Sequence, residues 1–462
     1  MGFDVDRCIE LHNRIVAHAR SHLPNHQPKI QRSWFTAHSL DPSSPGLGFE
    51  TDDERFEFEL DDELTAFLSA IDIVVPEEHQ HLAFNPLLVG IPPPSRLIPD
   101  MWLGTLEEHE DNYILLYMGT GYDPGGLVYS YSTQQVCYLD TPYLEPSDRY
   151  WDDLQNVLEF YWNCVESGKF VIDVECPGFG ERDNLTTQGW RIEEWTGLEL
   201  EGALEAWHSL VDTITKRLPG IEGTEDDGES QQNGKEEEAD TCLIPSEILE
   251  QYPAIPPFAR AFLSRAKKPT FTSIAPQLDV PNEAFIHRIG AKLQELYPNA
   301  SLTTRQHEID YLPNFLLFPW RTRGLQFVFQ SDHDRWQNKP GRTYTLDNRA
   351  GLYLTPDGTH AHSISLILPF PLGAHGHVRK NDGTTVEREC QGQSVLYQHG
   401  MCFPFLYAHG TPLAAVLANW WELVENEVWH VDEDGVVGGA DIWKEADTEE
   451  NAEDYQTNWS CF

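Results

Sequence analysis

Two tryptophans and two glutamates recur at equivalent places in two similar stretches of the chain. The stretches VLEFYWNCVESGKFVID and VLANWWELVENEVWHVD begin at positions 157 and 416 and are identical at six of seventeen positions. Trp162 and Glu166 of the first stretch correspond to Trp421 and Glu425 of the second. Carboxylates pair with guanidinium and ammonium groups, and tryptophan faces attract the same cations. We therefore predict that these four side chains bind a cationic substrate.

The same residues also have a structural explanation. Leu158, Trp162 and Val165 recur at helical spacing, so this tryptophan suits a helix packed on a core. A carboxylate present in both stretches more often makes a local pair or a cap than takes part in catalysis. The sequence leaves both interpretations of Glu166 and Glu425 open.

Histidines are concentrated upstream of the second stretch, between positions 360 and 409. We take His399 and His409 as candidate catalytic proton carriers, because imidazole gains and loses a proton near neutral pH. Four others would share one sheet face if two segments paired as a hairpin, and would then suit Zn²⁺ or Fe²⁺. They are His360, His362, His375 and His377. The turn would consist of the apolar segment ILPFPL, however, so we predict no metal and no cofactor.

One stretch of the chain is locally basic. It combines arginines with Trp320 and Trp336, a mixture that suits base stacking and phosphate contacts. The candidate RNA-docking residues are Arg321, Arg323, Arg335 and Arg342. Because acidic residues greatly outnumber basic ones, intramolecular salt bridges are the alternative explanation for these arginines.

The adjacent acids Asp152 and Asp153 suggest a pair of catalytic carboxylates. Asp152 aligns with Thr411 of the second copy, and Pro412 follows Thr411. This pattern is typical of a helix N-cap and the first helical residue. We therefore predict that Asp152 caps a helix.

The repeat extends upstream of these residues. Alternating apolar residues in GGLVYSYSTQQVCYLD, partly matched by GTTVERECQGQSVLYQH, predict a β-hairpin before the helix in each copy. Farther upstream, RIVAHARSHLPN matches RIGAKLQELYPN, and both patterns predict amphipathic helices that end at proline. We predict an α+β fold with two diverged copies of a helix, β-hairpin, helix and strand unit.

An acidic segment separates the two copies. It contains nine acids, one lysine and no aromatic residue, a composition typical of a disordered tether. The predicted domains are therefore residues 1–219 and 242–462, joined by a tether over 220–241.

The bulk composition narrows the function classes. With 31 basic and 75 acidic residues, the net charge of −44 disfavours nucleic-acid partners and favours cationic ones, although solubility alone also explains it. No secretory signal or membrane-length apolar run is present. The eight cysteines include no CxxC pair and suit reduced thiols. We expect a cytoplasmic protein with no membrane partner.

The first copy also resembles the SUKH superfamily. The resemblance is carried by Trp102, the strand-like runs 114–117, 126–129 and 136–139, and the helix-like run 157–162. SUKH domains are interaction modules, as in cell-wall regulators and toxin-immunity proteins. The resemblance therefore implies an α+β domain and a protein partner.

In overall character the chain is also similar to fungal arginine-containing cyclodipeptide synthases, which use an aminoacyl-tRNA donor. We accordingly predict an enzyme that handles a cationic amino acid, most concretely aminoacyl transfer that forms an arginine-containing cyclic dipeptide. Its partners would be a cationic small molecule or an aminoacyl-tRNA. The alternative is a non-catalytic, SUKH-like protein-interaction or regulatory module.

Overall fold

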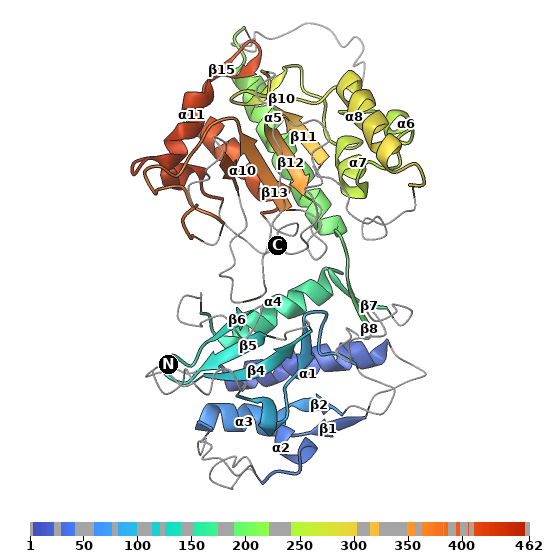
Figure 1. The fold of residues 1–462 in the computed structure, drawn as a ribbon, viewed down its shortest axis with the longest axis vertical. Helices are drawn as coiled ribbons and strands as arrows, with labels where there is room; N and C mark the ends of the chain where they lie inside the picture. The colour runs from blue at the N-terminus through green and yellow to red at the C-terminus, as the bar shows by residue number, and fades with distance from the viewer. Residues whose placement is uncertain are drawn as a thin grey trace, which may run out of the picture. The chain divides into compact units, whose positions relative to one another are not determined.

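The computed structural model describes residues 3–22, 29–41, 60–75, 82–98, 113–120, 125–139, 151–173, 189–220, 242–302, 315–322, 349–355, 363–381, 383–386, 394–397, 405 and 411–457. Contacts between residues divide the chain into two compact units (Figure 1). Unit 1 comprises residues 1–193 and 401–408, and unit 2 comprises residues 194–400 and 409–462. Within the described ranges, no helix has both the length and the apolar character needed to cross a bilayer.

Unit 1 combines helices with small antiparallel sheets. Its helices are α1 (Val5–Ser21), α2 (Trp34–Ala37), α3 (Asp62–Ala70), the 3-10 turn η1 (Pro94–Arg96) and α4 (Leu154–Glu166). Its strands are β1 (Ile30–Arg32), β2 (Asp72–Val74), β3 (Leu88–Gly90), β4 (Tyr113–Gly119), β5 (Gly126–Ser130), β6 (Val136–Leu139), β7 (Phe170–Asp173) and β8 (Gly189–Ile192). The strands β3 to β6 form an antiparallel sheet in sequence order, and β1–β2 and β7–β8 form two-stranded sheets.

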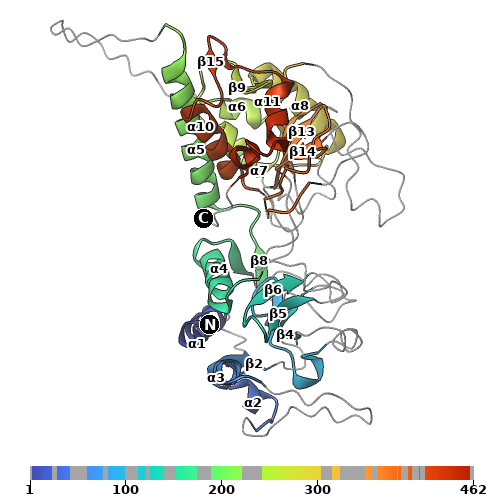
Figure 2. The ribbon, with the colours of Figure 1, turned by 90° about the vertical axis from the view of Figure 1, so that its left-hand side faces the viewer.

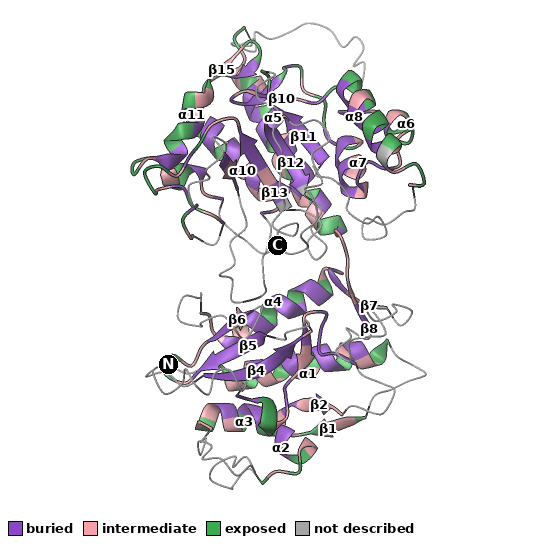
Figure 3. Cartoon of the chain, viewed as in Figure 1, coloured by how far each residue is buried: buried purple, intermediate pink, exposed green. Residues whose placement is uncertain are grey.

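The central strands of unit 1 are buried on both faces. Every residue of β4 and β5 is buried, as Figure 3 shows, and YILLYMG is accordingly continuously apolar rather than alternating. Helices α1 and α4 lie side by side and add their apolar faces to this core. The Asp4 carboxylate caps α1 by accepting a bond from the Arg7 N–H.

Unit 2 is also a mixture of helices and antiparallel sheets. Its helices are α5 (Gly197–Arg217), α6 (Ser246–Leu249), α7 (Pro257–Leu263), α8 (Glu283–Leu296), α10 (Leu413–Glu425) and α11 (Ala440–Lys444), with the 3-10 turns η5 (Glu445–Asp447) and η6 (Ala452–Tyr455). Its strands are β9 (Ser273–Ala275), β10 (Leu278–Asp279), β11 (Phe315–Pro319), β12 (Gly351–Thr355), β13 (Ser363–Leu368), β14 (Ser394–Leu396), β15 (Val431–Asp432) and β16 (Gly435–Val436). One sheet runs β11-β12-β13-β14 and the other runs β10-β9-β16-β15.

The core of unit 2 is built around α5 and α10, which lie side by side (Figure 2). A capping box of Thr196 and Glu199 begins α5 and satisfies its first backbone N–H groups. Also on α10, Trp420 packs against Trp429 and Trp443, and its indole donates to the Tyr397 hydroxyl. Each buried indole N–H in this cluster therefore has an acceptor, as burial requires.

The predicted α+β class is confirmed, and the strands and helix that carry the SUKH resemblance are present as β4, β5, β6 and α4. The units divide between Glu193 and Glu194, whereas the sequence-based boundary lay at residue 219, so α5 belongs to unit 2. Trp102 and all of the proposed tether except Gly220 lie outside the described residues.

Two upstream expectations for the second copy are corrected. The predicted hairpin partner of the strand at 394–396 was the segment starting at Gly383, but β14 pairs with β13, between Leu366 and Leu396 for example. The helix matched to α1 was the one that contains Arg288, yet that helix, α8, packs on α6. The helix that packs on α10, as α1 packs on α4, is α5.

The start of α4 corrects one further prediction, and the ends of α4 and α10 are alike. The N-cap residue of α4 is Asp153 rather than Asp152, whose carboxylate instead accepts the Asp153 N–H at 2.7 Å. At the other end, Gly168 takes φ of 75°, the left-handed conformation that commonly ends a helix, and the equivalent Glu427 takes φ of 60°. Asn426, the residue before Glu427, stays at φ of −86°.

Candidate functional site

In unit 1, the predicted substrate-binding residues face an arginine of the same chain. Helices α1 and α4 run in the same direction, because Arg7 pairs with Glu159 at 2.6 Å and Arg14 pairs with Glu166 at 3.2 Å. The Arg14 guanidinium carbon also lies 4.1 Å from the centre of the Trp162 ring. Arg14 is therefore held by a carboxylate and an aromatic face together, which is the arrangement expected for a cationic ligand.

Unit 2 repeats the arginine–glutamate pair at the ends of α5 and α10. Arg217 lies 3.6 Å from the Glu425 carboxylate, donates to the Glu425 backbone carbonyl at 2.8 Å, and lies 3.7 Å from Glu427. One turn earlier, the Trp421 indole donates to the Thr213 hydroxyl at 3.0 Å. These pairs show that α5 and α10 also run in the same direction.

The pairing has a plain electrostatic reason. Glu166 and Glu425 are the last residues of α4 and α10, where the negative end of a helix dipole disfavours a carboxylate. Arg14 and Arg217 offset that repulsion, and Arg217 also satisfies a helix-end carbonyl. Both glutamates are about half exposed, so each ion pair contributes only about 0.2–1 kcal/mol.

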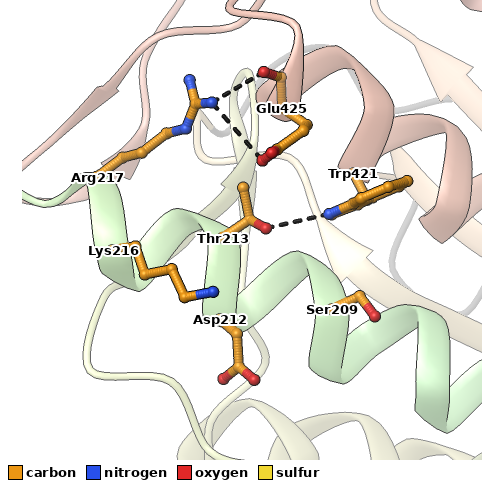
Figure 4. Close-up of a pocket in the computed structure, with 7 residues that line it drawn as sticks. All are labelled: Ser209, Asp212, Thr213, Lys216, Arg217, Trp421 and Glu425. Atoms are coloured by element: carbon orange, nitrogen blue, oxygen red, sulfur yellow. Dashed lines mark hydrogen bonds and ion pairs between the residues drawn. The ribbon is translucent and has the colours of Figure 1, made fainter.

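A surface pocket of about 500 Å³ opens beside this pair in unit 2 (Figure 4). Its lining comes from α5 and α10 and includes both predicted residues of the second copy. The lining residues are Ser209, Asp212, Thr213, Lys216, Arg217, Trp421 and Glu425. The sequence prediction of Trp421 and Glu425 as ligand-binding residues therefore falls on a pocket of the structure.

The charges in this pocket are mostly compensated. Glu425 is paired with Arg217, and Asp212 is paired with Lys267 at 2.9 Å. Lys216 has no ion-pair partner in the part of the chain that the structure describes. The rest of the described lining consists of the Ser209 and Thr213 hydroxyls and the Trp421 indole. A cationic ligand would have to displace Arg217 from Glu425, whereas an anionic group could approach Lys216 directly.

The predicted histidine sites are only partly described. His399 and His409 lie outside the described residues, as do His360 and His362. His375 and His377 lie in a loop whose backbone N–H groups donate to the buried Asp447 carboxylate, at 3.0 and 3.1 Å.

Within the described residues 363–381, the hairpin that would have brought the four histidines together is not formed. The neighbours of β13 are β12 and β14, whereas the loop of His375 and His377 is tied to η5. Among the described residues, no group of three or more histidine, cysteine or acidic side chains is placed to hold a metal ion.

Of the predicted RNA-docking residues, the structure describes Arg321 alone. Its guanidinium pairs with Asp279 at 2.8 Å, which is the salt-bridge alternative that the acidic composition suggested. Arg323, Arg335 and Arg342 lie outside the described residues.

Sequence reasoning missed a buried polar pair in unit 1. The His12 ring bonds to the Tyr117 hydroxyl at 2.7 Å and donates to the Asp72 carbonyl at 3.0 Å, and it stacks on Phe84. Burial lowers the pKa of His12 to about 4 and raises that of Tyr117, so both groups are neutral near neutral pH. A lone histidine on the apolar face of a helix is the signal that marks it.

Sequence reasoning also missed the arginine partners. Arg217 precedes Leu218-Pro219, and the first long helix is likewise followed by Leu23-Pro24. This shared Leu-Pro is the signal that could have matched α1 to α5.

Comparison of the chain with protein-family models, with curated proteins and with solved structures found no match.

Proposed function

We propose that this protein is a non-catalytic, cytoplasmic protein-interaction module built from two related, SUKH-like units. Its partner would be a protein with a basic surface. The observation that carries the proposal is that Glu166 and Glu425 form ion pairs with Arg14 and Arg217 of the same chain. The residues that recur in the two copies then stabilise the fold of each unit, and the acidic surface binds the partner.

The relation between the units is supported by their common order of elements. Each has a long helix, an antiparallel four-stranded sheet in sequence order, a second helix and a two-stranded hairpin. In each, the two helices run in the same direction and are joined by an arginine–glutamate pair at the C-terminal residue of the second helix. On this proposal, the second copy begins with α5, and unit 2 carries α6, α7 and α11 as additions.

The nature of the partner follows from charge. Acidic residues outnumber basic ones by 75 to 31 in the whole chain. Such a surface attracts cationic surfaces over a distance of a Debye length and repels phosphate backbones. Four described cysteines, Cys8, Cys137, Cys164 and Cys242, are free thiols, which suits a reducing compartment.

Chemical cross-linking of the tagged full-length chain in cells, with mass spectrometry of the products, tests this proposal. We expect a recurring protein partner whose cross-links lie on basic peptides. Capture of that partner by the purified tagged chain, without cross-linker, should fall sharply at about 0.5 M salt, where the Debye length shrinks to roughly 4 Å. The variants Glu166→Gln and Glu425→Gln should capture the same partner, because each carboxylate is engaged inside its unit.

A second candidate is the enzyme that handles a cationic amino acid, most concretely by forming an arginine-containing cyclic dipeptide from an aminoacyl-tRNA. The observation in its favour is the pocket lined by Trp421 and Glu425. Metabolite profiling of the same cells distinguishes the two. An arginine-containing product that depends on the chain and disappears in Glu425→Gln would establish the enzyme and refute the module.

A further inference from the structure

Two histidines stand one helical turn apart near the end of α1. His18 and His22 have ring centroids 4.5 Å apart and ring planes inclined by 38°. Residues four apart on a helix project from the same face. Imidazole nitrogens bind Zn²⁺ and related ions at about 2.0–2.1 Å, so one ion can lie between two rings at this separation.

The second ring is already oriented by its surroundings. The Nδ1–H of His22 donates to the His18 backbone carbonyl at 3.0 Å and lies 3.1 Å from the Ser21 hydroxyl. This bond places the proton on Nδ1 and leaves Nε2 with a free lone pair. Histidines that bind metals commonly donate their other ring nitrogen to a carbonyl in this way.

The surroundings also suit a cation. His18 and His22 lie at the C-terminal end of α1, where the helix dipole is negative. The nearby Arg14 charge is balanced by Glu166. Partial burial and the neighbouring His22 lower the pKa of His18, which keeps the ring available as a neutral ligand at neutral pH.

We propose that His18 and His22 form a binding site for a divalent transition-metal ion, with water completing the coordination. Two imidazole ligands favour Cu²⁺ over Zn²⁺ according to the general order of metal affinities. The site belongs to unit 1 alone and is independent of the proposed protein partner.

Two tryptophans beside the site supply a local readout. The His18 ring lies 6.0 Å from Trp162 and 6.3 Å from Trp190, between centroids. Bound Cu²⁺ quenches nearby indole fluorescence, whereas Zn²⁺ does not. Titration of the full-length, tag-free protein with CuCl₂ should therefore quench part of the fluorescence with the first equivalent, and only a large excess of ZnCl₂ should restore it by competition.

The variants His18→Ala and His22→Ala should bind the first equivalent of Cu²⁺ roughly tenfold more weakly or worse, and lose that quenching. His287→Ala is the matched control, because His287 is an exposed helical histidine that contacts the ring of Tyr252. His22 is exposed, so its removal should leave the circular dichroism spectrum unchanged. Unchanged affinity and quenching in both His18→Ala and His22→Ala would overturn the proposal.

Discussion

The helix pairs α1/α4 and α5/α10 carry the same residue types, but these residues make different contacts in the two pairs. In unit 1, Arg14 lies over the face of Trp162, which is buried to 8% exposure. In unit 2, Arg217 turns to the end of α10, and Trp421 instead bonds through its indole N–H to Thr213. The first arrangement fills the space beside the tryptophan, and the second borders a pocket.

The difference shows that a repeated motif can keep its electrostatics while its packing changes. The glutamate keeps an arginine partner in both units because both helices end at that glutamate. The tryptophan has no such constraint, so it is buried in one unit and partly exposed in the other. Any ligand role would thus be expected at Trp421 before Trp162.

Truncation of the two tryptophans gives the largest expected effect. Trp162→Ala should lower the free energy of unfolding of unit 1 by about 3–5 kcal/mol, the usual loss for a buried tryptophan. Trp421→Ala should cost roughly half as much, because the side chain is only partly buried. Urea denaturation with pulse proteolysis, read peptide by peptide, assigns each loss to its unit.

Phe variants provide the control, since Trp162→Phe and Trp421→Phe keep most of the apolar contact. Both should lose less stability than the alanine variants. Equal losses for Trp162→Ala and Trp421→Ala would contradict the contrast between a filled and an open helix pair.

The next largest expected effect is that acid lowers the stability of unit 1 more than that of unit 2. The unfolded chain binds a proton at His12 near the ordinary pKa of 6.5, whereas the folded chain binds it only near 4. The pKa of His12 is thus lower in the folded chain than in the unfolded chain. The contribution of neutral His12 to the free energy of unfolding is therefore complete above pH 6.5 and is lost as the pH falls toward 4. Between about pH 7 and pH 5.5 the expected loss in unit 1 is about 1 kcal/mol.

The buried polar group of unit 2 does not titrate in this range. Burial raises the pKa of Tyr397, which bonds to Asn419 and Trp420, so this network stays neutral throughout. The pH dependence of unit 1 should flatten in His12→Gln, whatever that variant does to absolute stability. An unchanged slope in His12→Gln would show that other groups cause the acid response.

The sequence predicted the local elements better than their partners. The strands β4, β5 and β6 and the helix α4 were expected because their apolar periodicity is local. The pairing of β14 with β13 was missed, since a three-residue strand such as β14 carries too little pattern to fix its neighbour.

The sequence predicted only part of the candidate site. Trp421 and Glu425 were found from the two similar stretches, because both stretches carry tryptophan and glutamate at the same helical positions. Arg217 was missed, because it lies 208 residues away from Glu425 and only the tertiary packing of α5 on α10 brings it there. A matched pair of helix-end acids is itself a reason to search for cations on the neighbouring helix.

The helix ends offer the smallest expected effect and the most direct comparison. Gly168 and Glu427 both adopt positive φ, of 75° and 60°, after α4 and α10. An L-residue pays about 1–2 kcal/mol for this conformation, and glycine does not. Gly168→Ala should therefore lower the stability of unit 1 by about 1 kcal/mol, measured by the same urea and proteolysis assay.

The reverse change in unit 2 should stabilise it. Glu427→Gly relieves the backbone strain but loses an exposed pair with Arg217 and adds freedom to the unfolded chain, so the net gain should be about 0.5 kcal/mol. Glu427→Gln is the control, because it removes the charge and keeps the strain. If Glu427→Gly destabilises unit 2 more than Glu427→Gln does, the positive φ of Glu427 does not strain the end of α10, because both variants lose the ion pair with Arg217.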